Sequence, residues 1–330
     1  MRILGKNFRK GLVKRALAIV PSTELKKQLI KRIIVQLKEI NVGEDFYDET
    51  LDVIVQTSAY VLRHYRSHVS THFDYILVDE AHRAAAHGLR NVLEYYNPQN
   101  LLGLTATDRL DQQRLEDIFG SYQINLSLEE AIKQKLIPQI RAFRLQSNID
   151  LSSVRFNGKE FVKSDLQKSV QVPSRDQLVV DLLVKYFSAS HSNSHTNESL
   201  QTKQGVIFCV DIKHAKRMSA LLNQHGVKSA SVHGTNRKGL DEYKQGAIQF
   251  LCACDLINEG WDAPQTSVIV MARPTMSKVL YTQQLGRGTR NHPDKEALYV
   301  IDVVDSYSSA LQPWSVHSLF NFGMYHHLAI

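Results

Sequence analysis

Cysteine, tryptophan and long apolar runs are scarce in this chain of 330 residues. It contains 3 cysteines and 2 tryptophans, and Cys209, Cys252 and Cys254 all lie in apolar segments. So few thiols exclude a disulfide scaffold and favour a reduced, cytoplasmic protein. The Cys-x-Cys pair also lacks the second pair of ligands that is typical of a zinc site. No apolar run approaches the roughly 18 residues of a membrane span, so we expect no contact with a membrane.

The start of the chain lacks acidic residues, the first of which is Glu24. The net charge of the whole chain is +7. Residues 1–20 contain six basic side chains: Arg2, Lys6, Arg9, Lys10, Lys14 and Arg15. A mitochondrial transit peptide has such a charge but is also rich in serine, and residues 16–20 already resemble a buried strand. A basic helix before that strand is therefore favoured. The positive charge favours polyanionic partners such as nucleic acid.

Short apolar runs alternate with longer amphipathic stretches, which is the pattern of β/α units on a parallel sheet. Helical periodicity is found at residues 24–37, 128–135, 175–187 and 212–225, and residues 188–204 favour a solvated loop. Buried strands are expected at residues 16–20, 52–56, 75–78, 101–104, 141–145, 205–210, 229–232, 248–252, 267–271 and 297–301. The fold class is therefore α/β with two tandem lobes. We expect lobe 1 at residues 1–137, lobe 2 at 138–310 and a tail at 311–330.

Two carboxylates, Asp79 and Glu80, follow the predicted strand at residues 75–78, and His82 comes next. Carboxylates near a buried strand are costly unless they hold a cation or join a hydrogen-bond network. Parallel sheets place their ligands at this end of the strands. Asp79 is therefore a candidate Mg²⁺ ligand and Glu80 can orient an attacking water. The alternative is a solvated strand end.

Hydroxyl side chains end the next predicted strand of the first lobe. Thr105 and Thr107 follow residues 101–104. Their hydroxyl groups could sense the neighbouring carboxylates, or Thr107 could cap a helix in residues 109–119. The sequence leaves both interpretations open.

In the second lobe, a basic segment at residues 283–290 is interrupted by glycines. Arg287 and Arg290 are three residues apart, so a helix would place them on one face. The glycines permit close approach of the backbone. Paired guanidinium groups suit a phosphate ligand, although arginine pairs are also common on solvated surfaces. Asp262 lies upstream in a glycine- and proline-containing turn, and we expect it near the same edge of the sheet.

Taken together and in order, these segments resemble the motifs of the superfamily 2 helicases and translocases, the DEAD/DEAH-type nucleic-acid motors. The resemblance implies two RecA-like lobes with a nucleotide cleft between them, ATP and Mg²⁺ as cofactors, and nucleic acid as a partner. Residues 128–138 are most similar to the branch of restriction-enzyme motor subunits and related repair helicases. That branch implies DNA rather than RNA, and partner subunits of a restriction or repair complex.

In the first lobe, the resemblance implies that Asp79, Glu80 and His82 form motif II, which binds Mg²⁺ and activates the hydrolytic water. Thr105 begins motif III, which couples hydrolysis to movement of the strand. Contacts to nucleic acid are implied for residues of motif Ia, of the segment after it and of motif III: Pro21, Ser22, Thr23, Thr57, Thr105 and Thr107.

In the second lobe, the resemblance implies that Arg287 and Arg290 of motif VI reach ATP as arginine fingers. Gln283 of the same motif is implied to lie near the phosphates or motif II. Motif V implies cofactor contacts for Gly260 and for Asp262, the latter near the ribose. Residues 205–210, leading into a helix, resemble motif IV.

One motif of the family is missing from the sequence. The phosphate-binding loop, Gly-x-x-x-x-Gly-Lys-Ser/Thr, should precede motif Ia, but residues 5–7 lack its first glycine and its hydroxyl. The amides and the lysine of that loop bind the phosphates of ATP. We therefore expect lobe 1 to lack its first strand, as in a truncated reading frame, and ATP hydrolysis to be poor or absent. The alternative is a non-catalytic nucleic-acid-binding remnant of such a helicase.

The chain contains 14 histidines, which raises the question of a metal site. His64, His68 and His72 are spaced by four residues, so a helix would place them on one face. Neutral imidazoles in that arrangement can bind zinc. An exposed stripe of histidines is the favoured interpretation.

Overall fold

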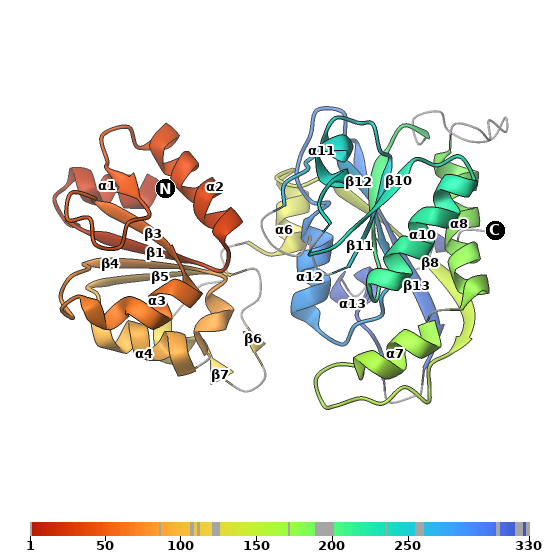
Figure 1. Cartoon of the computed structure of the whole chain (residues 1–330), viewed down its shortest axis with the longest axis horizontal. Helices are drawn as coiled ribbons and strands as arrows, with labels where there is room; N and C mark the ends of the chain where they lie inside the picture. The colour runs from red at the N-terminus through yellow and green to blue at the C-terminus, as the bar shows by residue number, and fades with distance from the viewer. Residues whose placement is uncertain are drawn as a thin grey trace. The chain divides into compact units, whose positions relative to one another are not determined.

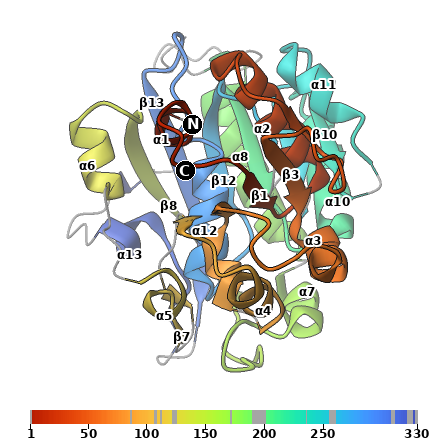
Figure 2. The same cartoon turned by 90° about the vertical axis from the view of Figure 1, so that its left-hand side faces the viewer.

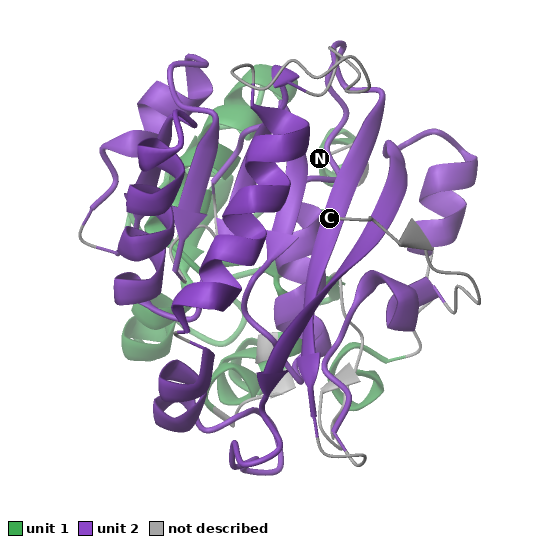
Figure 3. Cartoon of the chain, turned by 90° about the vertical axis from the view of Figure 1, so that its right-hand side faces the viewer, with its two compact units in different colours: residues 1–125 green, residues 126–330 purple. Residues whose placement is uncertain are grey.

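Two compact units make up the chain, unit 1 (Met1–Asn125) and unit 2 (Leu126–Ile330), which Figure 3 colours separately. Each unit is an α/β domain with one parallel sheet between helices, which confirms the predicted fold class. The computed structural model describes residues 2–85, 87–105, 109–110, 113–120, 126–170, 172–188, 201–234, 236–254, 261–307, 311–320 and 326–327.

The sheet of unit 1 has the strand order β2-β3-β1-β4-β5. Its strands are β1 (Ala16–Val20), β2 (Val42–Gly43), β3 (Val53–Thr57), β4 (Tyr75–Asp79) and β5 (Asn100–Leu104). Its helices are α1 (Arg2–Arg9), α2 (Thr23–Gln36), α3 (Ser58–His64), α4 (His87–Tyr96) and α5 (Glu116–Phe119). The shorter elements are the 3-10 turns η1 (Tyr65–Ser67) and η2 (Ala81–Ala85) and a ribbon of β6 (Arg109–Leu110) and β7 (Gln113–Arg114).

Helices cover both faces of this sheet, which explains why its central strands are continuous apolar runs. Successive side chains of a strand point to opposite faces. Leu17 and Ile19 of β1 therefore enter the core under α3 and α4, whereas Ala18 and Val20 enter the core under α1 and α2. Figures 1 and 2 show these two pairs of helices on opposite sides of the sheet. The edge strand β5 is only half-buried, and Leu104 is 47% exposed.

The sheet of unit 2 has the strand order β10-β11-β9-β12-β13-β8-β14. Its strands are β8 (Gln139–Asp150), β9 (Gln204–Phe208), β10 (Ser229–Val232), β11 (Phe250–Ala253), β12 (Thr266–Met271), β13 (Ala297–Ser306) and β14 (His326–His327). Its helices are α6 (Leu128–Lys133), α7 (Lys163–Val170), α8 (Pro173–Phe187), α10 (Ile212–Gln224), α11 (Gly239–Lys244), α12 (Lys278–Gly286) and α13 (Val316–Phe320). Helices α8 and α10 cover one face, and α11 and α12 cover the other.

The structure divides the chain after Asn125, before the boundary expected between residues 137 and 138. Helix α6 accounts for the difference, because Leu128 and Ile132 pack against the core of unit 2. The described residues of the segment expected as a tail, 311–320 and 326–327, also belong to unit 2. Val316 and Phe320 of α13 are buried in its core, and β14 pairs with β8.

Each of the ten expected strands is present, and β1 and β10 have the expected bounds. The basic helix expected before the first strand is α1. Where one longer helix was considered, residues 109–110 and 113–114 form a ribbon and residues 116–119 a short helix. Of the expected loop at residues 188–204, residues 189–200 lie outside the described part of the chain.

The structure shows where the few cysteines lie and how apolar the helices are. All three cysteines are buried, and among the described residues none forms a disulfide bond. Burial raises the pKa of the thiols of Cys209 and Cys252, which makes them poor nucleophiles. Among the helices of the described residues, none has the length and apolar character that crossing a bilayer requires.

Candidate functional site

One edge of the sheet of unit 1 carries the described site residues that were expected there. Because β1, β3, β4 and β5 are parallel, their carboxyl ends lie side by side, with Val20 opposite Thr57 and Asp79 opposite Leu104. Pro21–Thr23 follow β1, Thr57 ends β3, Asp79 ends β4 and Thr105 follows β5. Ligands of parallel α/β sheets bind at this kind of edge.

At this edge, His82 lies between the carboxylate of Glu80 and the hydroxyl group of Thr105. Its Nδ1 lies 3.0 Å from Thr105 Oγ1 and 3.2 Å from Glu80 Oε2, and the side chain is buried. The backbone N–H of Glu80 donates to Asp79 Oδ1 over 3.0 Å. Glu80 has a φ of 53°, a left-handed conformation that is uncommon for a residue with a side chain. The strand end is therefore a built cluster rather than a simple solvated turn.

Gly103 explains how motif II and the following strand come so close together. A Cβ atom at this position would lie 2.8 Å from the Cβ of Ala81 and 2.8 Å from Cε1 of Phe119. A side chain at this position would push η2 and α5 away from β5. The glycine therefore sets the distance at which Thr105 meets His82.

The residues expected to contact nucleic acid in unit 1 begin two helices. Ser22 Oγ accepts from the backbone N–H of Leu25 at the start of α2, and Thr57 Oγ1 accepts from that of Tyr60 at the start of α3. These contacts are helix N-caps, so both hydroxyl groups have a structural role. The start of a helix also attracts anions, because its first N–H groups and its dipole are positive. Thr23 is exposed beside Ser22.

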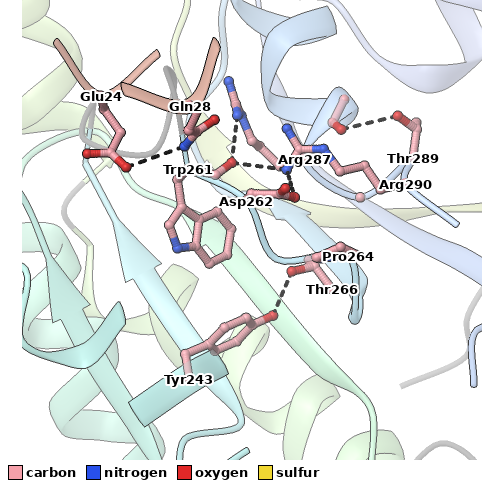
Figure 4. Close-up of polar contacts among 12 residues, drawn as sticks. Glu24, Gln28, Tyr243, Trp261, Asp262, Pro264, Thr266, Arg287, Thr289 and Arg290 are labelled. Carbon is pink, nitrogen blue, oxygen red and sulfur yellow. Dashed lines mark hydrogen bonds and ion pairs between the residues drawn. The ribbon is translucent and has the colours of Figure 1, made fainter. Parts of the chain in front are cut away.

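Other residues of these segments hold the edge in shape. Gln56 is buried, donates from Nε2 to the carbonyl of Glu44 over 2.7 Å, and accepts from the backbone N–H of Thr57. On α2, Gln28 Nε2 donates to Glu24 Oε1 over 3.4 Å (Figure 4). The contacts of Gln56 therefore tie the end of β3 to the segment after β2, whereas the bond of Gln28 lies within α2.

In unit 2, Arg287 and Arg290 converge on one carbonyl oxygen. Nη1 of Arg287 donates to the carbonyl of Trp261 over 2.8 Å, and Nη1 of Arg290 donates to the same oxygen over 3.1 Å (Figure 4). Arg290 also pairs with Asp262 Oδ1 over 2.5 Å. The carbonyl of Trp261 therefore holds both guanidinium groups at one place, and the carboxylate of Asp262 pairs with that of Arg290.

The structural reason for this arrangement differs from the expected one. Helix α12 ends at Gly286, so Arg287 is its C-cap and Arg290 lies beyond the helix, not on a shared helical face. Gly288 lies in the turn between them, and a Cβ there would be 2.4 Å from Cδ1 of Leu298. The close backbone approach expected for the glycines of this segment therefore belongs to Gly288. Gln283 is half-buried on α12.

A buried lysine holds this turn against the sheet. The ammonium group of Lys295 donates to the carbonyl oxygens of Thr266 and Gly288, and to that of Arg290 over 3.1 Å. Burial, followed by the nearby charge of Arg290, lowers the pKa of Lys295 to about 8. This residue was not singled out from the sequence, because nothing in its local pattern distinguishes it from a surface lysine.

Two of the expected site residues cannot be placed. Thr107 and Gly260 lie outside the described residues. The other candidates are placed on one edge of unit 1 or around the end of α12 in unit 2. Their roles in binding or catalysis stay predictions.

Unit 2 also has a basic hollow that the sequence did not reveal. Its volume is about 840 Å³, and it lies where β9, β10 and β11 end, beside the start of α10. Lysines from two helices line it, Lys163 and Lys168 of α7 and Lys213 of α10, together with His233. Asp211 caps α10 by accepting from the backbone N–H of His214 over 2.7 Å. Lysines around a strand-end hollow suit a phosphate-rich ligand.

Two sequence families match separate parts of the chain. Residues 1–109 match the family described as type III restriction enzyme, res subunit. Residues 180–292 match the helicase conserved C-terminal domain. The two matches fall in unit 1 and unit 2, in that order.

One curated relative is IRC3 of Saccharomyces cerevisiae, whose name describes an ATP-dependent helicase. It is 24% identical over 311 residues, which cover 89% of this chain and 44% of the relative. The chain therefore spans less than half the length of this relative.

Solved structures share the fold at low identity. The type ISP restriction-modification enzyme LlaBIII, solved bound to DNA, is similar with a TM-score of 0.61 and 14% identity over 94% of this chain and 26% of the enzyme. Dbp5 of S. cerevisiae, solved bound to RNA, is similar with a TM-score of 0.60 and 16% identity over 95% of this chain and 77% of Dbp5.

Proposed function

Because the chain belongs to the superfamily 2 helicases, on the branch of the restriction-enzyme motor subunits, we propose that it binds DNA and ATP but turns ATP over slowly. The observation that carries this proposal is the pair Arg287 and Arg290, held on the carbonyl of Trp261 beside Asp262. Guanidinium groups fixed before a ligand arrives lose little freedom on binding a phosphate.

The donor set of unit 1 suits Mg²⁺ bound with ATP. The metal prefers hard oxygen ligands, and Asp79 and Glu80 supply carboxylates at a strand end. The hydroxyl of Thr105 is linked to Glu80 through His82. When bound, Mg²⁺ would neutralise charge on the phosphates. We propose that Asp79 binds the metal and that Glu80 orients a water. His82 would position Glu80 and sense Thr105.

Slow turnover is proposed because the sequence has no Gly-x-x-x-x-Gly-Lys-Ser/Thr loop. Each charge-assisted contact that such a loop makes to a phosphate contributes about 1.5–3 kcal/mol. Phosphoryl transfer depends mainly on positioning and electrostatics, so the loss falls on the rate as well as on binding. The same observation favours the second candidate function, a nucleic-acid-binding protein without ATP hydrolysis.

We propose that the DNA backbone binds in the basic hollow of unit 2 and at the starts of α2 and α3 in unit 1. Lys163, Lys168 and Lys213 would neutralise phosphates without reading the sequence of the DNA. DNA is preferred to RNA because one of the matching families consists of restriction-enzyme subunits. On the same grounds we propose partner subunits of a restriction or repair complex. The buried, reduced cysteines fit a cytoplasmic location.

A first experiment measures ATP hydrolysis. Phosphate release by the purified chain, with and without single-stranded DNA, is compared between the wild type and Asp79→Asn. We expect both proteins to release phosphate near the background rate while DNA binding persists. Rapid, DNA-stimulated release that Asp79→Asn abolishes would contradict slow turnover and indicate a complete motor.

A second experiment measures binding to labelled single-stranded DNA and to RNA of matching sequence at several salt concentrations. Lys213→Gln should weaken DNA binding and reduce the slope of log affinity against log salt by about 0.7. Lys216→Gln is the matched control, because Lys216 is exposed on the same helix but does not line the hollow. Equal effects of the two variants would refute the assignment of the hollow. Tighter binding to RNA would refute the preference for DNA.

A further inference from the structure

Two histidines and a glutamate from separate segments meet at the amino-terminal edge of the sheet of unit 1, opposite the edge that carries Asp79. Glu49 lies shortly before β3, and His68 and His72 lie shortly before β4. Each offers one ligand atom, and these atoms all lie within 4.8 Å of one another. Such a set of two imidazoles and a carboxylate is typical of zinc ligands.

The hydrogen bond of His68 orients its ring as a metal ligand. Its Nε2 lies 2.8 Å from the carbonyl oxygen of Phe46, which can only accept, so Nε2 carries the proton. Nδ1 then bears the lone pair. Histidines that bind metals are commonly fixed in this way, by donating their other N–H to a backbone carbonyl.

His72 has a buried nitrogen with unused bonding capacity. The rings of His68 and His72 stack with centroids 3.9 Å apart and an angle of 11° between their planes. Within the described residues, nothing forms a hydrogen bond with Nε2 of His72, although this atom is shielded from solvent. A buried polar atom without a partner is costly, so this arrangement calls for a ligand. Burial, with the nearby charge of Arg15, lowers the pKa of His72 to about 4, which keeps its ring neutral.

The third group, Glu49, is ionised and held by a cation. Arg15 pairs with Glu49 and holds the pKa of its carboxyl below the usual value. Arg15 also donates to the carbonyl oxygens of Asp48 and Leu51, so it keeps two partners if Glu49 turns away. The guanidinium group of Arg15 is therefore the competitor of any metal for this carboxylate.

The prediction that His64, His68 and His72 share one face of a helix is wrong. Helix α3 ends at His64, and the chain continues through η1 into a turn. His64 stacks on Tyr60 at 4.2 Å, and its Nδ1 lies 3.4 Å from the hydroxyl oxygen of Tyr47. It is therefore occupied elsewhere, and Glu49 takes the third place beside the other two histidines.

We propose that Glu49, His68 and His72 form a zinc-binding site that joins the segment before β3 to the segment before β4. A tetrahedral zinc ion holds its ligand atoms about 3.3 Å apart, so the two stacked rings must tilt away from parallel for their nitrogen lone pairs to meet at one ion. Water would fill the fourth position. The aromatic rings of Phe46 and Phe73, packed edge-on against His68, shield one side of the site. Zinc bound here would stabilise unit 1 by mass action.

The site is tested by titrating the chelator-treated chain with ZnCl₂ in competition with a chromophoric chelator. We expect one strong site in the wild type and at least a tenfold weaker one in His72→Phe, which keeps the ring stack but removes the ligand atoms. His64→Phe is the matched control and should bind zinc as the wild type does. Arg15→Gln should bind zinc more tightly because it releases Glu49.

Cobalt provides a second measurement that needs no variant. Co²⁺ added to the wild type should give the visible absorption bands of tetrahedral coordination, saturating at one equivalent and reversed by Zn²⁺. The proposal is overturned if these bands do not appear, or if His72→Phe and His64→Phe bind zinc equally well. Circular dichroism of each variant shows whether a loss of binding follows from loss of the ligand or from unfolding.

Discussion

A fully buried ion pair in unit 2 allows a strict test of how this structure is stabilised. Arg175 on α8 pairs with Asp305 on β13 through two bonds, Nε to Oδ1 at 2.8 Å and Nη2 to Oδ2 at 2.9 Å, and neither side chain is exposed. Arg175 also donates to the carbonyl of Ala272 over 2.9 Å, and Ser147 donates to Asp305. The pair therefore ties α8, β8, β12 and β13 together.

We expect Arg175→Met to lower the free energy of unfolding of unit 2 by about 3–5 kcal/mol, because it leaves the carboxylate of Asp305 buried without its cation. With a typical urea dependence of about 2 kcal/mol/M, the midpoint falls by about 2 M. The double variant Arg175→Met, Asp305→Leu removes both charges, so it should recover most of this loss.

Urea denaturation followed by tryptophan fluorescence measures this change selectively. The chain has 2 tryptophans, Trp261 and Trp314, and both lie in unit 2, so unfolding of unit 1 does not contribute. Trp261 is almost fully buried, which ensures a change in emission on unfolding. The reasoning is refuted if Arg175→Met costs less than about 1 kcal/mol, or if the double variant is no more stable than the single one.

Two further predictions concern the site residues. Gly103→Ala should destabilise unit 1 by about 1–3 kcal/mol, because its Cβ would lie 2.8 Å from that of Ala81. Thermal unfolding followed by circular dichroism measures this change, and an unchanged midpoint temperature would disprove the prediction. Lys295 has its pKa lowered from 10.5 to about 8, so the unfolded chain binds more protons in that range. The free energy of unfolding of the wild type, relative to that of Lys295→Met, should therefore rise by up to about 3 kcal/mol from pH 8 to pH 10.5. Urea denaturation of both proteins across this pH range measures it, and a difference in free energy that does not change with pH would contradict the prediction.

The parts of the fold that sequence predicts well are those determined by local composition. Strands β1 and β10 were predicted with the observed bounds, and the helix expected at residues 24–37 is α2, at Thr23–Gln36. Asp79 and Thr105 were expected at one edge because parallel strands align their ends. In each case a short segment carries the whole signal.

The parts that sequence did not predict depend on contacts between distant segments. Lys295 reaches Thr266 across 29 positions, and Glu49 meets His68 and His72 only because β3 and β4 both pair with β1. Arg287 and Arg290 were expected on one helical face, but Gly288 packs against Leu298 and the helix ends before them. No local pattern contains this information.

The position of β5 has a practical consequence for handling the protein. Among the described strands of unit 1, β5 is an edge strand that pairs with β4 alone. The backbone amides and carbonyls along such a margin can pair with another copy of the same strand, and Leu104 beside them is largely open to solvent. Concentrated solutions of the chain therefore have an inbuilt route to intermolecular sheet growth, and a charged residue in place of Leu104 is the simplest means of blocking it.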